Sequence, residues 1–286
     1  MSSSLEDTKF ILRKYNITAN KKLGQNFLIN DNVIENIIEA SNIEEKDLVI
    51  EIGPGLGTLT SKLLERAEKV IAIELDDKMI SILKDRFKLY NNFILLNDDV
   101  LKIDLNSLIK ENVGDLEKIK IVANLPYYIT TPIIMKLLED KLGIYSITVM
   151  VQKEVADRIT AMPGDKLSGA ITYSVNYYAE AKKIVFVDKS SFIPAPEVDS
   201  EVIKLDIRKT PVVEVDNEEM FFRVIKASFM QRRKTLVNGL VNSGIITDKV
   251  RIKEIFDNIG IDMNIRGEKL TIEQFAELSN LIYRDI

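Results

Sequence analysis

The chain has 286 residues, which is enough for one large domain or two, and 46% of them are hydrophobic and 29% charged. It contains no Cys and no His, which excludes disulfides, thiolate or imidazole metal sites, cysteine nucleophiles and histidine-based triads. Lys and Arg number 39 against 44 Asp and Glu, so the net charge of −5 lacks the overall basic signature of a nucleic-acid binder. Any binding of nucleic acid must therefore use a local patch.

No apolar run approaches the roughly 18 residues of a membrane-spanning helix, and the N-terminus shows no signal-peptide pattern. We therefore expect a cytoplasmic protein with no membrane partner. Composition alone leaves a carboxylate-only magnesium site open, but no metal site is predicted.

Residues 1–46 are predicted to be mostly helical, with Asn30 or Asp31 capping a helix whose apolar residues recur at helical spacing. From about residue 47, short apolar strands alternate with amphipathic helices, a pattern that predicts a doubly wound α/β domain. Continuous apolar strands of this kind are usually buried on both faces of a parallel sheet. The predicted strands are 48–52, 69–74, 92–96, 119–124, 145–151, 182–188 and 201–207.

After Arg208 the strands stop, and Thr210-Pro211 with the acidic stretch 214–219 indicates a linker or domain entry. We predict an α/β domain over residues 1–208 and a small all-α domain over 209–286. The helices expected in this second domain are 217–230, 233–243, 248–258 and 271–284.

The first strand of the α/β domain runs into a glycine loop, with Glu51 before Gly53, Gly55 and Gly57. Glycines permit a tight turn and a close approach of a ligand to the backbone at the start of a helix. The dinucleotide fingerprint G-x-G-x-x-G requires a glycine at position 58, where this chain has Thr, which makes an oxidoreductase improbable. The spacing G-x-G-x-G after an acidic residue is that of S-adenosylmethionine (SAM) methyltransferases.

Carboxylates end the next two strands in the order that such a cofactor requires. Glu74 can accept hydrogen bonds from ribose hydroxyls, and Asp99 can accept one from an adenine amine, with Asp98 as the alternative. Either residue alone is more simply a polar strand end. Together with the glycine loop they favour cofactor binding.

The fourth strand ends in Asn124-Leu125-Pro126-Tyr127. A loop that fixes an amide oxygen and backbone carbonyls can accept both protons of an exocyclic amine, and the tyrosine ring can stack on a base. Alone, these four residues are equally compatible with a strand-to-helix turn. After a SAM-type loop, they are typical of amino-methyltransferases that act on adenine, cytosine or glutamine nitrogen.

Further motifs occur in order along nearly the whole chain: KKLGQNFL at 21–28, SFIPAPEVDS at 191–200 and FMQRRKTL at 229–236. With the glycine loop and NLPY they resemble the small-subunit ribosomal RNA adenine dimethyltransferase family. The resemblance implies a Rossmann-like class I methyltransferase domain with a helical RNA-docking domain. One departure is Tyr128, where many relatives are expected to have Asn, and it affects the expected wall of the target pocket.

The resemblance also implies residue roles. Asn26 and Leu28 are expected at the methionine end of SAM, Gly53 beside the cofactor, Glu74 at its ribose and Asp99 at its adenine. Asn124 is expected to contact the cofactor and to face the target amine, with Tyr127 and Phe192 on either side of the target base. Five basic residues are expected to contact RNA: Lys21, Lys22, Arg232, Arg233 and Lys234.

The implied function is SAM-dependent N6,N6-dimethylation of two adjacent adenines near the 3′ end of small-subunit rRNA. The implied partner is the immature small ribosomal subunit, and a monomer is expected. Two alternatives stay open: a macrolide-resistance-type methyltransferase of large-subunit rRNA, and a non-catalytic ribosome assembly factor. QRRKT and LGQNFL favour the small-subunit branch, and the intact motif set favours an enzyme.

Overall fold

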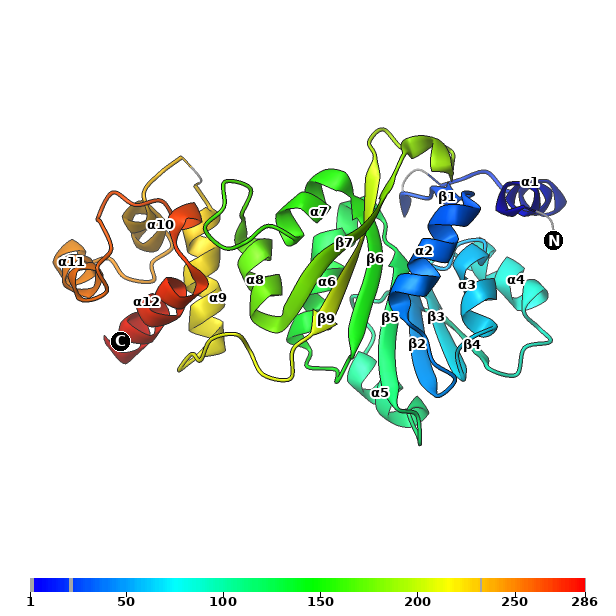
Figure 1. Ribbon diagram of the computed structural model, residues 1–286, viewed down its shortest axis with the longest axis horizontal. Helices are drawn as coiled ribbons and strands as arrows, with labels where there is room; N and C mark the ends of the chain where they lie inside the picture. Colours follow the sequence, from blue (N-terminus) through cyan, green and yellow to red (C-terminus); the bar gives the residue numbers. More distant parts are fainter. Residues whose placement is uncertain (1–2, 21–22, 232, 286) are drawn as a thin grey trace. The chain divides into compact units, whose positions relative to one another are not determined.

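The computed structural model describes residues 3–20, 23–231 and 233–285 (Figure 1). Its internal contacts divide the chain into two compact units. The first unit comprises residues 1–156 and 181–207, and the second comprises 157–180 and 208–286.

The first unit contains a mixed sheet with the strand order β4-β3-β2-β5-β6-β9-β7. Neighbouring strands from β4 to β6 run parallel, whereas β9 is antiparallel to β6, with Ser146 opposite Asp206. The predicted α/β class is confirmed, and the parallel pattern ends at the antiparallel strand β9. The strands are β2 (Asp47–Ile52), β3 (Lys69–Glu74), β4 (Phe93–Asn97), β5 (Lys118–Asn124), β6 (Ser146–Gln152), β7 (Ala179–Val187) and β9 (Ser200–Ile207).

Helices α2, α3 and α4 lie along one face of this sheet (Figure 1). Alternate strand residues such as Val49 and Val70 are fully buried against helix residues such as Ile37, Leu63 and Leu83. This burial holds the sheet rigidly, and the carboxyl ends of its parallel strands are the edge where such sheets bind ligands. The helices of the unit are α1 (Ser4–Lys14), α2 (Asp31–Ser41), α3 (Thr58–Leu64), α4 (Asp77–Arg86), α5 (Leu105–Asn112), α6 (Thr130–Glu139) and the 3-10 turns η2 (Tyr127–Ile129) and η3 (Lys189–Ser191).

Two short strands complete the first unit: β1 (Phe27–Leu28) pairs antiparallel with β8 (Phe192–Ile193). Neither was predicted, because a two-residue strand has no periodicity to detect. The pairing ties the N-terminal segment to a loop more than 160 residues later in the chain, beside the cavity described below.

The second unit is helical, with α8 (Ala170–Tyr178), α9 (Glu218–Phe229), α10 (Leu236–Asn242), α11 (Lys249–Asn258), the turn η4 (Gly267–Lys269) and α12 (Ile272–Asp285); α7 (Lys153–Ile159) spans the boundary between the units. The predicted boundary at 208/209 placed residues 157–180 in the first domain, whereas their contacts group them with this unit. The reason is aromatic packing, since the Tyr173 ring lies 4.8 Å from that of Phe275 and the Tyr177 ring 5.1 Å from that of Phe221. Among the described residues, no helix is long and apolar enough to cross a membrane.

Candidate active site

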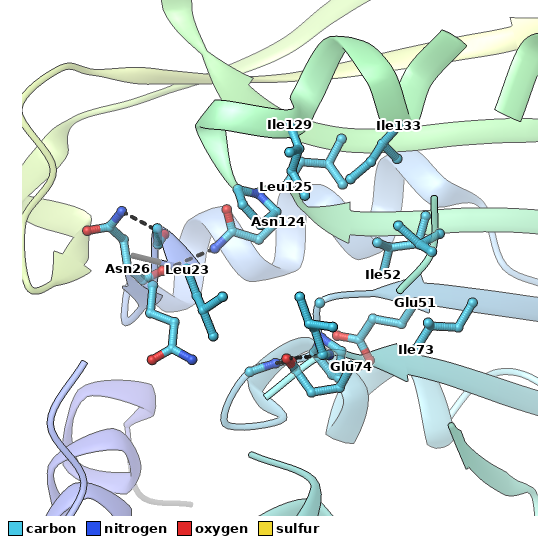
Figure 2. Close-up of a pocket in the computed structure, with 18 of the residues that line it drawn as sticks. Leu23, Asn26, Glu51, Ile52, Ile73, Glu74, Asn124, Leu125, Ile129 and Ile133 are labelled. Atoms are coloured by element: carbon cyan, nitrogen blue, oxygen red, sulfur yellow. Dashed lines mark hydrogen bonds between the residues drawn. The ribbon is translucent and has the colours of Figure 1, made fainter. Parts of the chain in front are cut away.

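A cavity in the first unit opens at the carboxyl ends of β2, β3, β4 and β5, and the segment before α2 closes one side of it (Figure 2). Open α/β sheets bind ligands at this edge. The cavity wall includes all but one of the residues predicted to hold a cofactor: Asn26, Leu28, Glu51, Gly53, Gly55, Glu74, Asp99 and Asn124. The exception is Gly57.

The glycine loop uses its glycines for two different purposes. Gly53, at φ +67°, would place a Cβ in open space with no atom within 4 Å, so its missing side chain leaves room in the cavity. Gly57, at φ +84°, would place a Cβ 2.5 Å from Phe87, because the loop packs directly on the end of α4. Gly57 is therefore a packing residue, and its predicted contact with a cofactor is not supported by the cavity lining.

Glu74 lies buried at the end of β3, and its carboxylate is held by backbone amides. Its Oε1 accepts from the amides of Leu75 and Asp76, both at 2.9 Å, and its Oε2 accepts from Gly55 at 3.1 Å. A carboxylate offers about four acceptor positions, so about one remains for a ribose hydroxyl rather than two. Burial raises the pKa of Glu74, and the three amide hydrogen bonds oppose that effect.

Glu51 lies deeper, at the end of β2, with 1% of its surface exposed. The Thr60 hydroxyl donates to its Oε2 at 2.6 Å. Burial raises the pKa of Glu51 to about 8; the Thr60 hydrogen bond opposes this shift, and the neighbouring Glu74 carboxyl adds to it. The carboxyl is thus largely protonated at neutral pH.

The two carboxylates after β4 both line the cavity. Asp99 Oδ1 accepts from the Leu101 amide at 3.0 Å, and Asp98 Oδ1 accepts from the Asp99 amide at 2.7 Å. Lys102 lies 3.5 Å from Asp99. Asp99 is thus held in a turn at the cavity rim, and the choice between Asp98 and Asp99 as adenine acceptor stays a prediction.

Asn124 and Asn26 meet across the cavity mouth (Figure 2). The Asn124 Nδ2 donates to the backbone carbonyl of Asn26 at 3.2 Å, and the Asn26 Nδ2 donates to the carbonyl of Gly24 at 3.2 Å. Because the amide nitrogen of Asn124 is engaged, its oxygen is the group left to accept from a ligand.

The remaining predicted target-base residues fall in two environments. Leu125, Pro126 and Tyr127 line the cavity, and the Tyr127 hydroxyl shares a 2.6 Å hydrogen bond with Ser200. Phe192 instead lies in the core with 3% of its surface exposed, on β8 opposite Leu28, and it is not part of the cavity wall. The structure therefore does not bring Phe192 to a position where its ring could cover a base.

The cavity wall also includes Tyr128, which the sequence singled out, and apolar residues that carried no individual signal in the sequence. Ile52, Leu75 and Val100 give it apolar surface, and Tyr128, 56% exposed, stands at its mouth beside Gly24. Only the LGQNFL motif pointed to Gln25, whose Nε2 donates to Asp76 at 2.7 Å.

The structure describes two of the five predicted RNA-contacting residues. Arg233 and Lys234 are exposed in the turn between α9 and α10 of the second unit. Lys21, Lys22 and Arg232 fall outside the residues that the structure describes.

The donor set of this cavity fits SAM. Apolar side chains flank carboxylates and amides at the strand ends, an arrangement suited to an adenine ring, a ribose and a cationic amino-acid end. The glycine loop leaves open space beside Gly53 for the cofactor to approach the backbone. The fold and site are those of a Rossmann-like class I methyltransferase, an enzyme with SAM as its cofactor.

The chain belongs to a specific family of these enzymes, because the family described as "Ribosomal RNA adenine dimethylase" matches residues 16–284. It is 48% identical over 281 residues to "Ribosomal RNA small subunit methyltransferase A" of Bacillus pumilus, covering 97% of this chain and 96% of that protein. It is 52% identical over 277 residues to the protein of that name from Clostridium botulinum, covering 97% and 98%. The protein is thus an rRNA adenine dimethyltransferase.

Solved structures agree with this assignment. A dimethyladenosine transferase from Plasmodium falciparum is 28% identical with a TM-score of 0.73, covering 88% of this chain and 95% of that one. The 23S rRNA methyltransferase ErmE is 25% identical with a TM-score of 0.67, covering 90% and 100%.

Proposed function

We propose that the enzyme dimethylates N6 of two adjacent adenines near the 3′ end of small-subunit rRNA and acts on the immature small subunit. The supporting observation for this branch is identity of about half of the residues to relatives named for the small subunit, over nearly the whole chain. The relative named for 23S rRNA is half as similar, at 25%. We further propose that the enzyme acts as a monomer in the cytoplasm.

The nucleophile is the difficult partner in this reaction, because the lone pair of an adenine amine is delocalised into the ring. SAM, when bound, supplies a methyl group on a sulfonium, which is a good leaving group. The protein's task is to hold the amine so that its nitrogen becomes pyramidal and faces that methyl group. Positioning of this kind needs no strong base, which fits a chain without His or Cys.

The first acceptor for the amine is the Asn124 side-chain oxygen, oriented by the bond from its Nδ2 to Asn26. Two backbone carbonyls are candidates to accept a hydrogen bond from the second proton of the amine. The Pro126 carbonyl already accepts from the Ile129 amide at 3.2 Å and from the Thr130 hydroxyl at 3.1 Å. The Leu125 carbonyl accepts no hydrogen bond from the described residues, so we assign the second acceptor role to it.

We assign base stacking to Tyr127, because this residue lines the cavity and its hydroxyl is held by the hydrogen bond with Ser200. Stacking of one base contributes about 1–3 kcal/mol. The opposite face of the base is not assigned to Phe192, because its side chain is buried on β8, paired with Leu28 of β1.

The exposed turn with Arg233 and Lys234 is proposed to contact phosphates, together with Lys21, Lys22 and Arg232. Replacing Arg233 and Lys234 by Gln should reduce the slope of log affinity against log salt by about 1.4–1.8, or about 0.7–0.9 per contact. Filter binding to small subunits at several salt concentrations measures this slope. An unchanged slope refutes the contact.

The function is tested by incubating the protein and labelled SAM with small subunits that lack dimethyladenosine, and with unmodified large subunits. Nuclease digestion and mass spectrometry should find N6,N6-dimethyladenosine in small-subunit RNA alone. Label in large-subunit RNA would favour the resistance-type alternative, and tight binding without label would favour an assembly factor.

The assigned role of Asn124 has its own variant. Asn124→Ala should lose at least about 100-fold in methylation rate, far more than it loses in affinity for SAM, because the amine loses its oriented acceptor. Normal methylation by this variant would contradict the mechanism.

A further inference from the structure

Helix α1, residues Ser4–Lys14, precedes the segment 16–284 that matches the family. It is held to α4 by two sets of polar contacts. Asp7 pairs with Arg86 at 2.7 Å, and both Lys14 and Tyr15 bond to Asp85, at 3.1 and 2.5 Å. These contacts are separate, because one set uses the start of α1 and the other its end.

Of these two sets, the Asp7–Arg86 pair is the one connected to the cofactor cavity. The Arg86 guanidinium donates through Nη2 to Asp7 and through Nη1 to the backbone carbonyl of Leu56, and its side chain is 17% exposed. Leu56 lies inside the glycine loop, is 1% exposed and lines the cavity. One side chain therefore joins α1, α4 and the loop that receives SAM.

The glycine loop needs such a support. Gly53, Gly55 and Gly57 all have positive φ, and glycine loses more conformational freedom on ordering than any other residue. The end of α4 supports this loop twice, since Phe87 packs against Gly57 and Arg86 bonds to Leu56. A loop ordered before binding lowers the entropic cost of binding.

We propose that Arg86 is a positioning residue for the cofactor loop and that Asp7 on α1 holds Arg86 in place. Without the Asp7 carboxylate the guanidinium can turn to solvent, which leaves the buried Leu56 carbonyl unpaired and the loop less ordered. Cofactor affinity and the docking of α1 are thereby coupled. Coupling of this kind is reciprocal, so SAM binding also stabilises the docked helix.

Asp7→Asn tests the proposal, and Lys14→Gln is its matched control, because it removes the other ion pair of α1 and leaves Arg86 untouched. Affinity for S-adenosylhomocysteine is measured by calorimetry on the full chain. Asp7→Asn should weaken it about 5-fold, the low end of typical coupling, because the Asp7 side chain is 39% exposed. Lys14→Gln should not change it, and Asp7→Glu should restore most of it.

Two further readouts separate positioning from a general loss of stability. Asp7→Asn should raise the KM for SAM and leave kcat unchanged, and in an Arg86→Ala background it should add no further loss. Amide exchange of α1 should slow when S-adenosylhomocysteine binds the wild type, and much less so in Asp7→Asn. Equal affinities for Asp7→Asn and Lys14→Gln, or an undiminished effect of Asp7→Asn without Arg86, would overturn the proposal.

Discussion

The buried carboxyl of Glu51 should make the stability of this protein fall as pH rises, and Glu51→Gln should remove that effect. Glu51 lies near the end of β2 with 1% of its surface exposed, and burial raises its pKa to about 8 from the ordinary 4.5 of a glutamate. Glutamine is nearly isosteric with the protonated carboxyl, and its side-chain oxygen can still accept the hydrogen bond of Thr60. The substitution therefore removes the ionisation with little change in packing.

The sign follows from proton binding. Below about pH 4.5 both the folded and the unfolded protein hold the Glu51 proton, so Glu51 adds no pH dependence. Between about 4.5 and 8 the unfolded chain has released it and the folded protein retains it, so stability falls by about 1.4 kcal/mol per pH unit. Above pH 8 the loss levels off. From pH 5 to pH 8 the sum is about 3.5 kcal/mol.

Urea unfolding of the wild type and of Glu51→Gln at pH 5, 6, 7 and 8 measures this difference. The free energy of unfolding of the variant, minus that of the wild type, should grow by about 3.5 kcal/mol over this range. Because all other titrating groups are shared, the subtraction isolates Glu51. A difference that stays constant with pH would show that Glu51 is ionised in the folded protein and would refute the reasoning.

Three further substitutions test the packing of the glycine loop and a buried ion pair. Gly57→Ala places a Cβ 2.5 Å from Phe87 at positive φ and should destabilise the fold by about 1–3 kcal/mol. Gly53→Ala has open space around its Cβ and should cost only about 1 kcal/mol of backbone strain. Thermal unfolding of the two variants compares these losses, and equal losses would contradict the packing role of Gly57. Lys120 and Asp47 form an ion pair at 2.6 Å, and both side chains are 1% exposed. Lys120→Met leaves the Asp47 carboxylate buried without a partner and should lower the free energy of unfolding by about 3–5 kcal/mol, measured in urea. A loss below about 1 kcal/mol would contradict this reasoning.

The central strands of the sheet could be predicted well because they are buried on both faces. Predicted strands 69–74 and 119–124 correspond to Lys69–Glu74 and Lys118–Asn124. The helices of the second unit were also close, since predicted 248–258 is observed as Lys249–Asn258. In both cases the element is determined by which residues are buried, and the periodicity of apolar residues in the sequence shows this.

Features that depend on contacts between distant segments could not be predicted. The grouping of 157–180 with the second unit rests on rings of Tyr173 and Tyr177 that meet partners far along the chain. The burial of Phe192 rests on the pairing of β8 with β1. A motif identifies the residue type that a site requires, but it carries no information on whether the ring faces a cavity or a core.

The site depends on how its groups are positioned more than on reactive side chains, and the segment before α2, which forms one of its walls, shows why. The backbone carbonyl of Asn26 orients the Asn124 amide at 3.2 Å, and Gln25 bonds to Asp76 at 2.7 Å, next to Glu74. The segment before α2 therefore holds both Asn124, the proposed acceptor for the target amine, and the loop after Glu74, the proposed partner of the cofactor ribose. A displacement of about 1 Å at such a contact can cost about 100-fold in rate when positioning supplies most of the catalysis. The residues that govern this enzyme consequently include backbone groups that carry no chemical signature in the sequence.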